Sequence, residues 1–583
     1  MHMRVDPAAR KKGVTPNEIF MSIFLLEFDD ILPTALLSSP PPSCHTLIRM
    51  TRLISHWTSR AAENFKLLFQ IRDEPTQSDS QKGEQGIRVG IQRPISPIVL
   101  LSKLDKDHWL ALLAGFIAFY ADFLDFNVLA TATTKIADYY QTSKTHVSDS
   151  ITYTMALRVV GAAIFGFFGD LVGRRWPLII DLVLLGSLQV ATIYCTSMNA
   201  FFLYRAGFGI CMGAVWSLAG STIFDITPPE CRGLLGGIFQ ASAACSGLTA
   251  AGLNMAFGAA PESWKMMFWI SCGVSYFAAI IRFIIPESKQ FREAEEKRKA
   301  LEIVRLQTLM EMHGTVKQVK RHHRLTVFCR EFSKMFRLHW QTFLYSALFV
   351  FLTSWANHSY GDNYFTFLID GKGINNRDAS IIAMITKTGC ISGMVTIGWL
   401  GEYLGRRRIA AACTIMAALL LPASISPSSF WGLCLGGWFY QFFVESFGAV
   451  LASHLNELSP VAFRAVMPGV AYQLGTSLSA PSSWIVNKIA EKKHIVVDGK
   501  SVEAYGPVMQ ATAGICYILM ILLAIFGPER RGADLEHFEP AGMKIDDETI
   551  ISHDEEEGRS SVADIDDERQ PMLEGQKRQH NVL

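Results

Sequence analysis

The sequence predicts an all-α polytopic membrane protein with 12 transmembrane helices in two six-helix halves. Half of its 583 residues are hydrophobic and 18% are charged, whereas charged residues make up about a quarter of a typical soluble chain. Apolar runs recur at the length of about 20 residues that a membrane-spanning helix needs, and a strongly charged stretch divides them into two sets of six. The predicted spans are 108–130, 149–169, 176–195, 199–222, 233–256 and 264–285, then 339–360, 378–400, 408–425, 430–453, 464–487 and 508–527.

Two of these spans depart from a plain apolar run. Segment 408–425 is short, and 339–360 ends in the polar stretch TSWANHSYGDNYFT at 353–366. Polar side chains are costly in lipid, so those of 353–366 are expected to line a wet cavity if the segment is buried in the membrane.

The polar and charged stretches define the remaining parts of the chain. The tail after Gly532 has too little apolar content to bury a core, so it is expected to be disordered. No cleavable signal peptide is visible, and a start at Met50 would make residues 1–49 an extension of the gene model. The expected parts are a cytoplasmic tail at 1–104, a first half at 105–286, a basic cytoplasmic linker at 287–338, a second half at 339–528 and an acidic cytoplasmic tail at 529–583.

Lys and Arg gather in alternate loops, which predicts the orientation. Basic residues follow the second, fourth, eighth and tenth spans, and the largest group is in the linker. By the positive-inside rule these segments and both termini face the cytoplasm, although the basic segment 488–500 falls on the other side. We expect a multi-pass protein of the plasma membrane, with trafficking or ubiquitination machinery as partners of its tails.

Several classes of function find no support in the composition. The 11 cysteines occur without C-x-x-C or C-x-x-H pairs, which predicts neither a metal site nor a disulfide framework. No nucleophile–base, phosphate-loop or metal-ligand spacing is present, so neither an enzyme nor a cofactor is expected. The net charge of +1 gives no indication of nucleic-acid binding.

The loop after the second predicted span and the loop after the eighth share one pattern. They are GFFGDLVGRR, from Gly166, and GWLGEYLGRR, from Gly398, and both fit G-x-x-x-[D/E]-x-x-G-R-R. Glycines let two helices approach closely, and the carboxylate can pair with arginines or cap a neighbouring helix when the cytoplasmic side is shut. Halves that repeat one loop are expected from parallel repeats related by an axis along the membrane normal.

This repeated loop, together with the two sets of six spans, resembles the signature of the major facilitator superfamily over roughly residues 100–530. The fourth span adds RAGFGICMG, in which Arg205 either faces a partner or cavity or snorkels outward as a packing residue. PES at 286–288 is also typical of these carriers. The resemblance implies gating between two conformations by Gly166, Asp170, Gly173, Arg174, Arg175, Arg205, Gly398, Glu402, Gly405, Arg406 and Arg407.

Shorter stretches are similar to the fungal Jen-type monocarboxylate permeases of the sialate:proton symporter group. The closest matches are HLNELSP at 454–460 and YQLG at 472–475, with TYTMALRVVGAAIFG at 152–166 and GPERRG at 527–532 beside them. That family's seventh-span signature, N-x-x-[S/T]-H-x-[S/T]-Q-D-x-x-x-T, falls on 354–366. His358, Asp362 and Thr366 match it, whereas Ser354, Asn357, Tyr360 and Gly361 depart from it.

The resemblance implies that Arg158 and Gln473 contact the substrate, with Thr476 in place of the family's asparagine. A guanidinium suits a carboxylate because it is planar, binds bidentately and stays charged. Lys387, at a roughly corresponding place in the second half, is either a second cation for the substrate or the partner of an acid such as Glu445.

His358 and Asp362 are four residues apart and can touch on a helix. Histidine changes charge near neutral pH, so the pair can take up a proton outside, release it inside, and contact the substrate. Alternatively, the pair is a structural hydrogen bond at the mouth of the helix. Asp122, Asp125 and Glu445 are rival proton carriers.

The resemblance therefore predicts a proton-coupled symporter that imports lactate, pyruvate or acetate by alternating access. Its expected partners are a small carboxylate, a proton and the lipid bilayer. The alternatives are a carrier of di- or tricarboxylates or sugar acids, and a carboxylate sensor that binds without transporting.

Overall fold

The computed structural model describes residues 91–257, 262–287, 322–459, 465–497 and 500–529, and isolated positions at 64–66, 68, 292, 293, 296, 300 and 463. Contacts divide the chain into Met1–Glu63 and Asn64–Leu583, and only the second unit contains described residues. The alternative start at Met50, the middle of the linker and the acidic tail from 530 onward lie outside the described residues.

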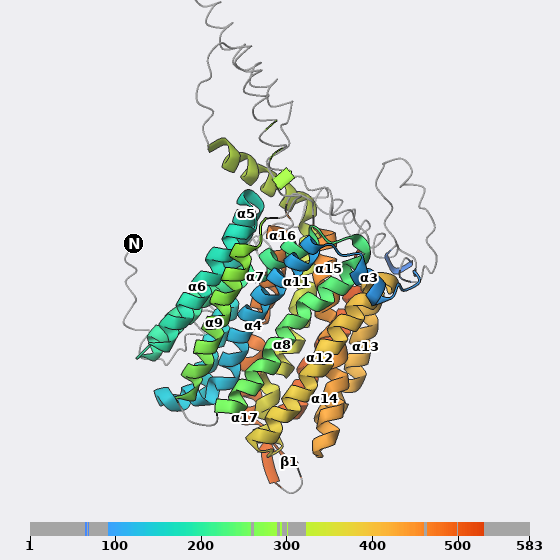
Figure 1. The fold of residues 1–583 in the computed structure, drawn as a ribbon. Coiled ribbons are helices and arrows are strands. Elements are labelled where there is room, and N and C mark those ends of the chain that lie inside the picture. Colours follow the sequence, from blue (N-terminus) through green and yellow to red (C-terminus); the bar gives the residue numbers. More distant parts are fainter. Residues whose placement is uncertain are drawn as a thin grey trace, which may run out of the picture. The chain divides into compact units, whose positions relative to one another are not determined.

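In the described residues, the first half contains six long helices that alternate in direction (Figure 1). They are α4 (Lys106–Tyr140), α5 (Lys144–Val172), α6 (Arg175–Ile193), α7 (Met198–Phe224), α8 (Arg232–Phe257) and α9 (Ser263–Ile284). Serine caps fix two of the starts, because the side chains of Ser143 and Ser197 accept from the backbone N–H groups of His146 and Ala200.

The second half follows the same order with two interrupted members. Its helices are α11 (His322–Thr366), α12 (Asn376–Leu404), α13 (Arg406–Ile425), α14 (Phe430–Val444) with α15 (Ser446–Leu458), α16 (Val466–Ser479) with α17 (Pro481–Lys492), and α18 (Tyr505–Phe526). A π-helical turn, η5 (Phe367–Gly371), follows α11. The antiparallel hairpin of β1 (His494–Val497) and β2 (Lys500–Glu503) precedes α18, and the sequence did not predict it.

The interruptions fall in the predicted tenth and eleventh spans. α14 and α15 meet at Glu445. Its backbone N–H still donates to the carbonyl of Gln441 at 3.3 Å, so the hydrogen bonding of α14 continues up to the break. α17 begins at Pro481, which lacks the N–H needed to continue α16. Among the described residues, nine helices are long and apolar enough to cross a membrane. These two broken spans and the more polar α11 fall outside that set.

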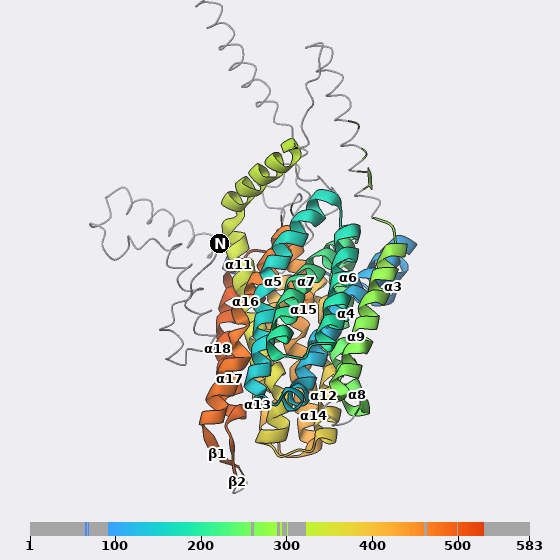
Figure 2. The ribbon, with the colours of Figure 1, turned by 90° about the vertical axis from the view of Figure 1, so that its left-hand side faces the viewer.

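The two halves meet along α8 and α12, and along α5 and α16. Both views show α8 beside α12 (Figures 1 and 2). Glycines permit the contact, because a Cβ on Gly398 would come within 2.7 Å of the carbonyl oxygen of Gly233 and 2.9 Å of the Cα of Gly237. A Cβ on Gly166 would likewise lie 3.0 Å from the Cα of Val466. The first glycine of each repeated loop motif therefore lies where the halves touch.

We call the end of the bundle with the loops at 173–175 and 405–407 the loop end, and the opposite end, with β1 and β2, the hairpin end. Gly173 and Gly405 have φ of 103° and 97°, a region that favours glycine, so these turns require it. Residues 91–102, including α3 (Pro97–Ser102), form a strap at the loop end. Trp399 on α12 donates to the carbonyl of Ile95 at 2.9 Å, and buried Leu100 packs in the main core.

Candidate functional site

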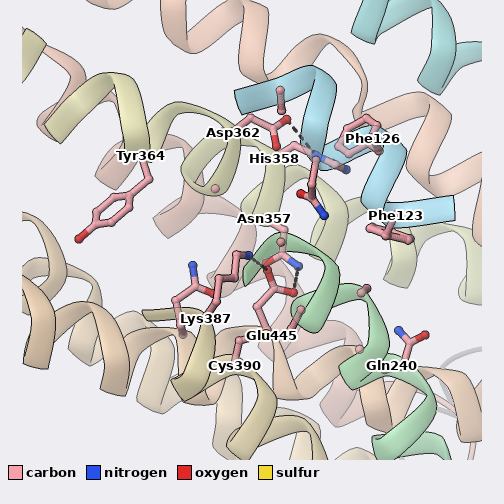
Figure 3. Close-up of a pocket in the computed structure, with 18 of the residues that line it drawn as sticks. Phe123, Phe126, Gln240, Asn357, His358, Asp362, Tyr364, Lys387, Cys390 and Glu445 are labelled. Carbon is pink, nitrogen blue, oxygen red and sulfur yellow. Dashed lines mark hydrogen bonds and ion pairs between the residues drawn. The ribbon is translucent and has the colours of Figure 1, made fainter. Parts of the chain in front are cut away.

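A cavity of about 230 Å³ lies between the two halves of the bundle. The first half lines it with α4, α5 and α8, and the second half with α11, α12, α14, α15 and α16. Figure 3 shows polar side chains from several helices pointing into it. The polar lining residues are Asn127, Thr131, Arg158, Gln240, Asn254, Thr353, Ser354, Asn357, His358, Asp362, Ser380, Thr386, Lys387, Gln441, Glu445 and Thr476.

Two carboxylates hold the halves together at the loop end. Asp170 of the first half accepts from the backbone N–H groups of Ala465 and Val466, at 3.1 and 2.9 Å, where α16 begins. Glu402 of the second half accepts from the N–H of Gly233, at 3.2 Å, in the first turn of α8. A negative charge stabilises a helix N-terminus, so each acid of the repeated loop caps a helix of the opposite half.

The arginines of the repeated loops hold these acids in place. Arg174 forms an ion pair with Asp225 and lies 3.8 Å from Asp170. Arg406 lies between Glu402, at 2.6 Å, and Glu457, at 2.9 Å, and the side chains of Arg406 and Glu457 are fully buried. Glu457 belongs to the HLNELSP stretch and was not among the predicted site residues.

Two further acids, which the sequence analysis also missed, cap the helices that follow the loops. Glu287 accepts from the backbone N–H of Arg175 at 2.9 Å, at the start of α6. Glu529 accepts from the N–H groups of Arg406 and Arg407, at 3.0 and 3.2 Å, at the start of α13. Each acid follows the last helix of its half in a Pro-Glu pair, a signal that was visible in PES and GPERRG.

Arg158 on α5 lies in the cavity wall with 3% of its surface exposed. Its guanidinium faces the rings of Phe123 and Phe126 on α4, at 5.7 and 5.6 Å from the centroids. Its Nε has no hydrogen-bond partner, and no ion pair within 4.0 Å reaches Arg158 in the part of the chain that the structure describes. A buried charge without a bonded counter-ion is costly, so this guanidinium favours an anion beside it.

Two neighbouring residues of α11, Asn357 and His358, each contact a carboxylate in the cavity wall (Figure 3). His358 Nδ1 lies 3.0 Å from Asp362 Oδ2, and the His358 ring meets the edge of Phe126 with centroids 6.3 Å apart. Asn357 Nδ2 donates to Glu445 Oε2 at 3.2 Å, and Lys387 Nζ lies 3.9 Å from Glu445 Oε1. The predicted His–Asp contact is therefore present, and Lys387 lies beside Glu445, one of its two expected roles.

Gln473 and Thr476, the two expected substrate contacts on α16, are placed differently. Thr476 lines the cavity, and its hydroxyl lies 3.5 Å from that of Ser354. Gln473 is not among the lining residues, because its Nε2 donates to the carbonyl of Gly213 on α7 at 3.2 Å. The contact of Gln473 with substrate therefore finds no support in this geometry, although the two residues are three apart.

Asp122 and Asp125 are buried inside the first half and are not among the cavity-lining residues. Asp125 lies 3.9 Å from Arg205, which also donates to Gln189 at 3.1 Å and faces the ring of Phe208 at 4.2 Å. Arg205 is fully buried, so it faces partners within its half rather than snorkelling outward.

An aromatic pair lies between the cavity and the loop end. Tyr472 on α16 stacks on Trp216 on α7, with centroids 4.2 Å apart and an angle of 8° between the rings. Trp216 Nε1 donates to Gln240 Oε1 at 3.1 Å, and both Tyr472 and Gln240 line the cavity. The pair joins the two halves on the loop-end side of the cavity. No local pattern predicts this contact, since the two rings are far apart in the chain.

Comparison with known proteins gives a consistent set of relatives. The family model described as "Sugar (and other) transporter" matches residues 110–540. The carboxylic acid transporter protein homolog of Saccharomyces cerevisiae is 26% identical over 78% of this chain and 75% of its own length. The 4-hydroxybenzoate transporter of Acinetobacter baylyi is 21% identical over 54% of this chain and 70% of its own length.

Solved structures with the same fold are also transporters. The proton:xylose symporter XylE covers 74% of this chain and 97% of its own, at 18% identity and a TM-score of 0.56. A human organic anion transporter covers 72% of this chain and 99% of its own, at 13% identity and a TM-score of 0.51. At these identities the likeness concerns the fold alone.

Proposed function

This chain belongs to the sugar (and other) transporter family and has the major facilitator fold, and from that premise we propose that it imports a small monocarboxylate together with a proton. Arg158 carries the proposal, because it is a buried cation in the cavity wall with no bonded carboxylate among the described residues. A planar guanidinium can hold a carboxylate through two parallel hydrogen bonds. The rings of Phe123 and Phe126 stabilise the cation while the cavity is empty.

The relatives support an organic acid as substrate. One is named for the transport of carboxylic acids and another for the transport of 4-hydroxybenzoate. Among the described lining residues, Arg158 is the cation without a bonded carboxylate, and its single charge matches a monocarboxylate such as lactate, pyruvate or acetate better than di- and tricarboxylates. His358, Lys387 and Thr476 lie in the same lining and are the proposed further polar contacts for the substrate.

Transport would follow alternating access, in which the halves rock about the central cavity. We place the loop end in the cytoplasm because the basic loops lie there. The caps made by Asp170 and Glu402 then close the cytoplasmic side, and the cavity is reached from outside the cell. Proton carriers are proposed among the titratable groups of the lining, the His358–Asp362 pair and Glu445. We propose the plasma membrane as its location.

The test is uptake of labelled lactate, pyruvate, acetate and succinate into yeast that lacks its own permeases, across a range of external pH. We expect uptake of a monocarboxylate to increase as the outside becomes more acidic. Arg158→Ala should abolish this uptake, because the carboxylate loses its cation. Arg377→Ala, at the exposed start of α12, is the matched control and should transport normally.

Three results would contradict parts of the proposal. Normal kinetics in Arg158→Ala would remove that residue from the site. A current driven by voltage alone would rule out one-to-one symport, because a monoanion moved with one proton carries no net charge. Binding without uptake by the wild-type protein would favour a sensor.

A further inference from the structure

The tenth membrane-crossing segment changes helix at Glu445, in the wall of the cavity. α14 ends at Val444 and α15 begins at Ser446. The Glu445 carboxylate reaches toward two other helices (Figure 3), with Lys387 on α12 at 3.9 Å and Asn357 on α11 at 3.2 Å. One carboxylate therefore connects three segments of the second half.

Asn357 is suited to both charge states of that carboxylate. Its Nδ2 donates to the ionised form, and its Oδ1 is buried with no hydrogen-bond partner among the described residues. Rotation of the carboxamide would let Oδ1 accept the O–H of protonated Glu445, because an amide carries both donors and an acceptor. Leaving a buried acceptor unpaired is costly, so the rotated form recovers a hydrogen bond when the proton arrives.

The formal charges of the lining balance while Glu445 is ionised. With His358 neutral, the described lining carries two cations, Arg158 and Lys387, and two carboxylates, Asp362 and Glu445. A proton on Glu445 leaves one positive charge in excess, which matches the single carboxylate of a substrate. An excess charge in a low-dielectric cavity attracts an anion more strongly than it would in water.

The other candidate acids are placed differently. Asp362 contacts His358 on the same helix, so a proton taken there acts on a contact within α11. Asp122 and Asp125 are not among the lining residues. Glu445 is the lining acid whose charge acts on contacts among three helices.

We propose that Lys387 and Glu445 form a proton-switched second part of the carboxylate site, an inference that rests on the monocarboxylate transport proposed above. While ionised, Glu445 neutralises Lys387 and repels the substrate. One proton from the solution at the open end of the cavity converts the carboxylate to the acid, whose O–H then donates to Asn357. Lys387 is freed for the substrate's carboxylate. One proton and one monoanion enter together, so the loaded cavity has the same net charge as the empty one.

Other titratable groups surround Glu445. The phenols and thiol among them are neutral near pH 7, so the proton carriers to compare are Glu445 and the His358–Asp362 pair. The experiment must separate these two. The surrounding groups are Lys387 and Cys390 on α12, His358 and Asp362 on α11, Tyr440 on α14, Tyr472 on α16 and Tyr517 on α18.

The test uses the full-length protein in lipid vesicles, with labelled lactate or whichever monocarboxylate the yeast assay identifies. Exchange across the membrane without a pH gradient reports binding and rocking, and accumulation driven by a pH gradient reports coupling. Glu445→Gln imitates the protonated acid. We expect it to exchange measurably, to bind substrate with the same affinity at mildly acidic and mildly alkaline pH, and to lose all accumulation. Asp362→Asn should still accumulate substrate, with an altered KM. Glu503→Gln, on β2 at the hairpin end, is the control with wild-type behaviour.

Removing one partner of a buried pair can destabilise a protein, because the other charge is left uncompensated. If Glu445→Gln does not fold, the double variant Lys387→Gln with Glu445→Gln removes both charges. It should exchange with weaker affinity and fail to accumulate. If the wild type accumulates substrate and either variant does so too, the switch is wrong but the proposed transport function stands. A wild-type protein that moves no carboxylate in either mode overturns the proposed function, and the switch with it.

Discussion

At the residue scale, the Trp216–Tyr472 stack joins the two halves at the loop-end side of the cavity, which we call the cavity floor. For the cavity to open toward the loop end, these rings must separate, because one is on α7 and the other on α16. Gln240 connects the stack to the site, since it accepts from Trp216 and lines the cavity. A substrate that contacts Gln240 can therefore influence the stack directly.

Tyr472→Ala should weaken the floor without removing the cations of the site. A stacked aromatic pair contributes about 0.5–1.5 kcal/mol beyond its buried area, which corresponds to a change of roughly two- to tenfold in the population of the closed floor. We expect accumulation to fall by a similar factor while downhill uptake persists. The measurement is the steady-state ratio of labelled substrate inside and outside vesicles. Tyr472→Phe keeps the ring and should retain most of the accumulation, and an equal loss in both variants would contradict a role for stacking.

Local spacing predicted contacts within one helix and left out those between distant segments. His358 and Asp362 were expected to touch because four residues make one helical turn, and their side chains lie 3.0 Å apart. The expected contact of Gln473 with substrate rested on the family resemblance, which does not say which neighbour a helix face meets in this chain. Gln473 meets the backbone of Gly213 instead. The pairing of Arg406 with Glu457 depends on tertiary packing, which helix periodicity does not encode.

At the element scale, Glu287 and Glu529 stabilise equivalent helices of the two halves. At the start of the helix after the repeated loop, Glu287 accepts one backbone N–H of α6, and Glu529 accepts two of α13. The first N–H groups of a helix have no partner within it, so an outside acceptor lowers the free energy of the folded state. Arg407 also donates to the carbonyl of Ala524 at 2.9 Å, which ties α13 to α18.

Glu529→Ala should destabilise the protein by about 1 kcal/mol, the usual contribution of an N-cap. The measurement is thermal unfolding of the purified protein in detergent, followed by tryptophan fluorescence. Glu262→Ala is the matched control, because Glu262 sits at the N-cap of α9 without a capping side-chain bond. Equal midpoints for Glu529→Ala and wild type would contradict this role for Glu529.

The number and order of the membrane-crossing segments followed from hydrophobicity, but the breaks within them did not. Pro481 marked one break, because proline cannot donate to the preceding turn. The sequence around Glu445 predicts its break less clearly. A lone acid in an apolar run indicates a functional site as readily as an irregular helix. The β1–β2 hairpin overlaps the end of the basic segment 488–500, which opposed the other loops in the predicted orientation.

At the scale of the whole molecule, Asp170 and Glu402 determine how firmly the loop end stays shut. Each is a carboxylate that accepts backbone N–H groups from the opposite half, and a hydrogen bond to a charged group contributes about 1.5–3 kcal/mol. The strap crosses the same end, where it bonds to Trp399 of the second half. Opening toward the loop end must break these contacts together.

Asp170→Ala and Glu402→Ala should each shift the protein toward the state that is open at the loop end. The shift can be followed at Gly361, which lines the cavity and has space for a larger side chain. In a cysteine-free background carrying Gly361→Cys, an impermeant thiol reagent added from outside should react severalfold more slowly in each variant. Reagent added from the loop side should react faster. Unchanged rates from both sides would show that the caps do not control the equilibrium.

The caps made by Asp170 and Glu402 show how the two halves are related in space. The acid between the second and third helices of each half caps the fifth helix of the other, α16 in one direction and α8 in the other. Such reciprocity is what an isologous interface requires, in which one patch contacts its own copy across a two-fold axis. The two contacts are therefore equivalent, and each half takes the place that one subunit takes in a two-fold dimer.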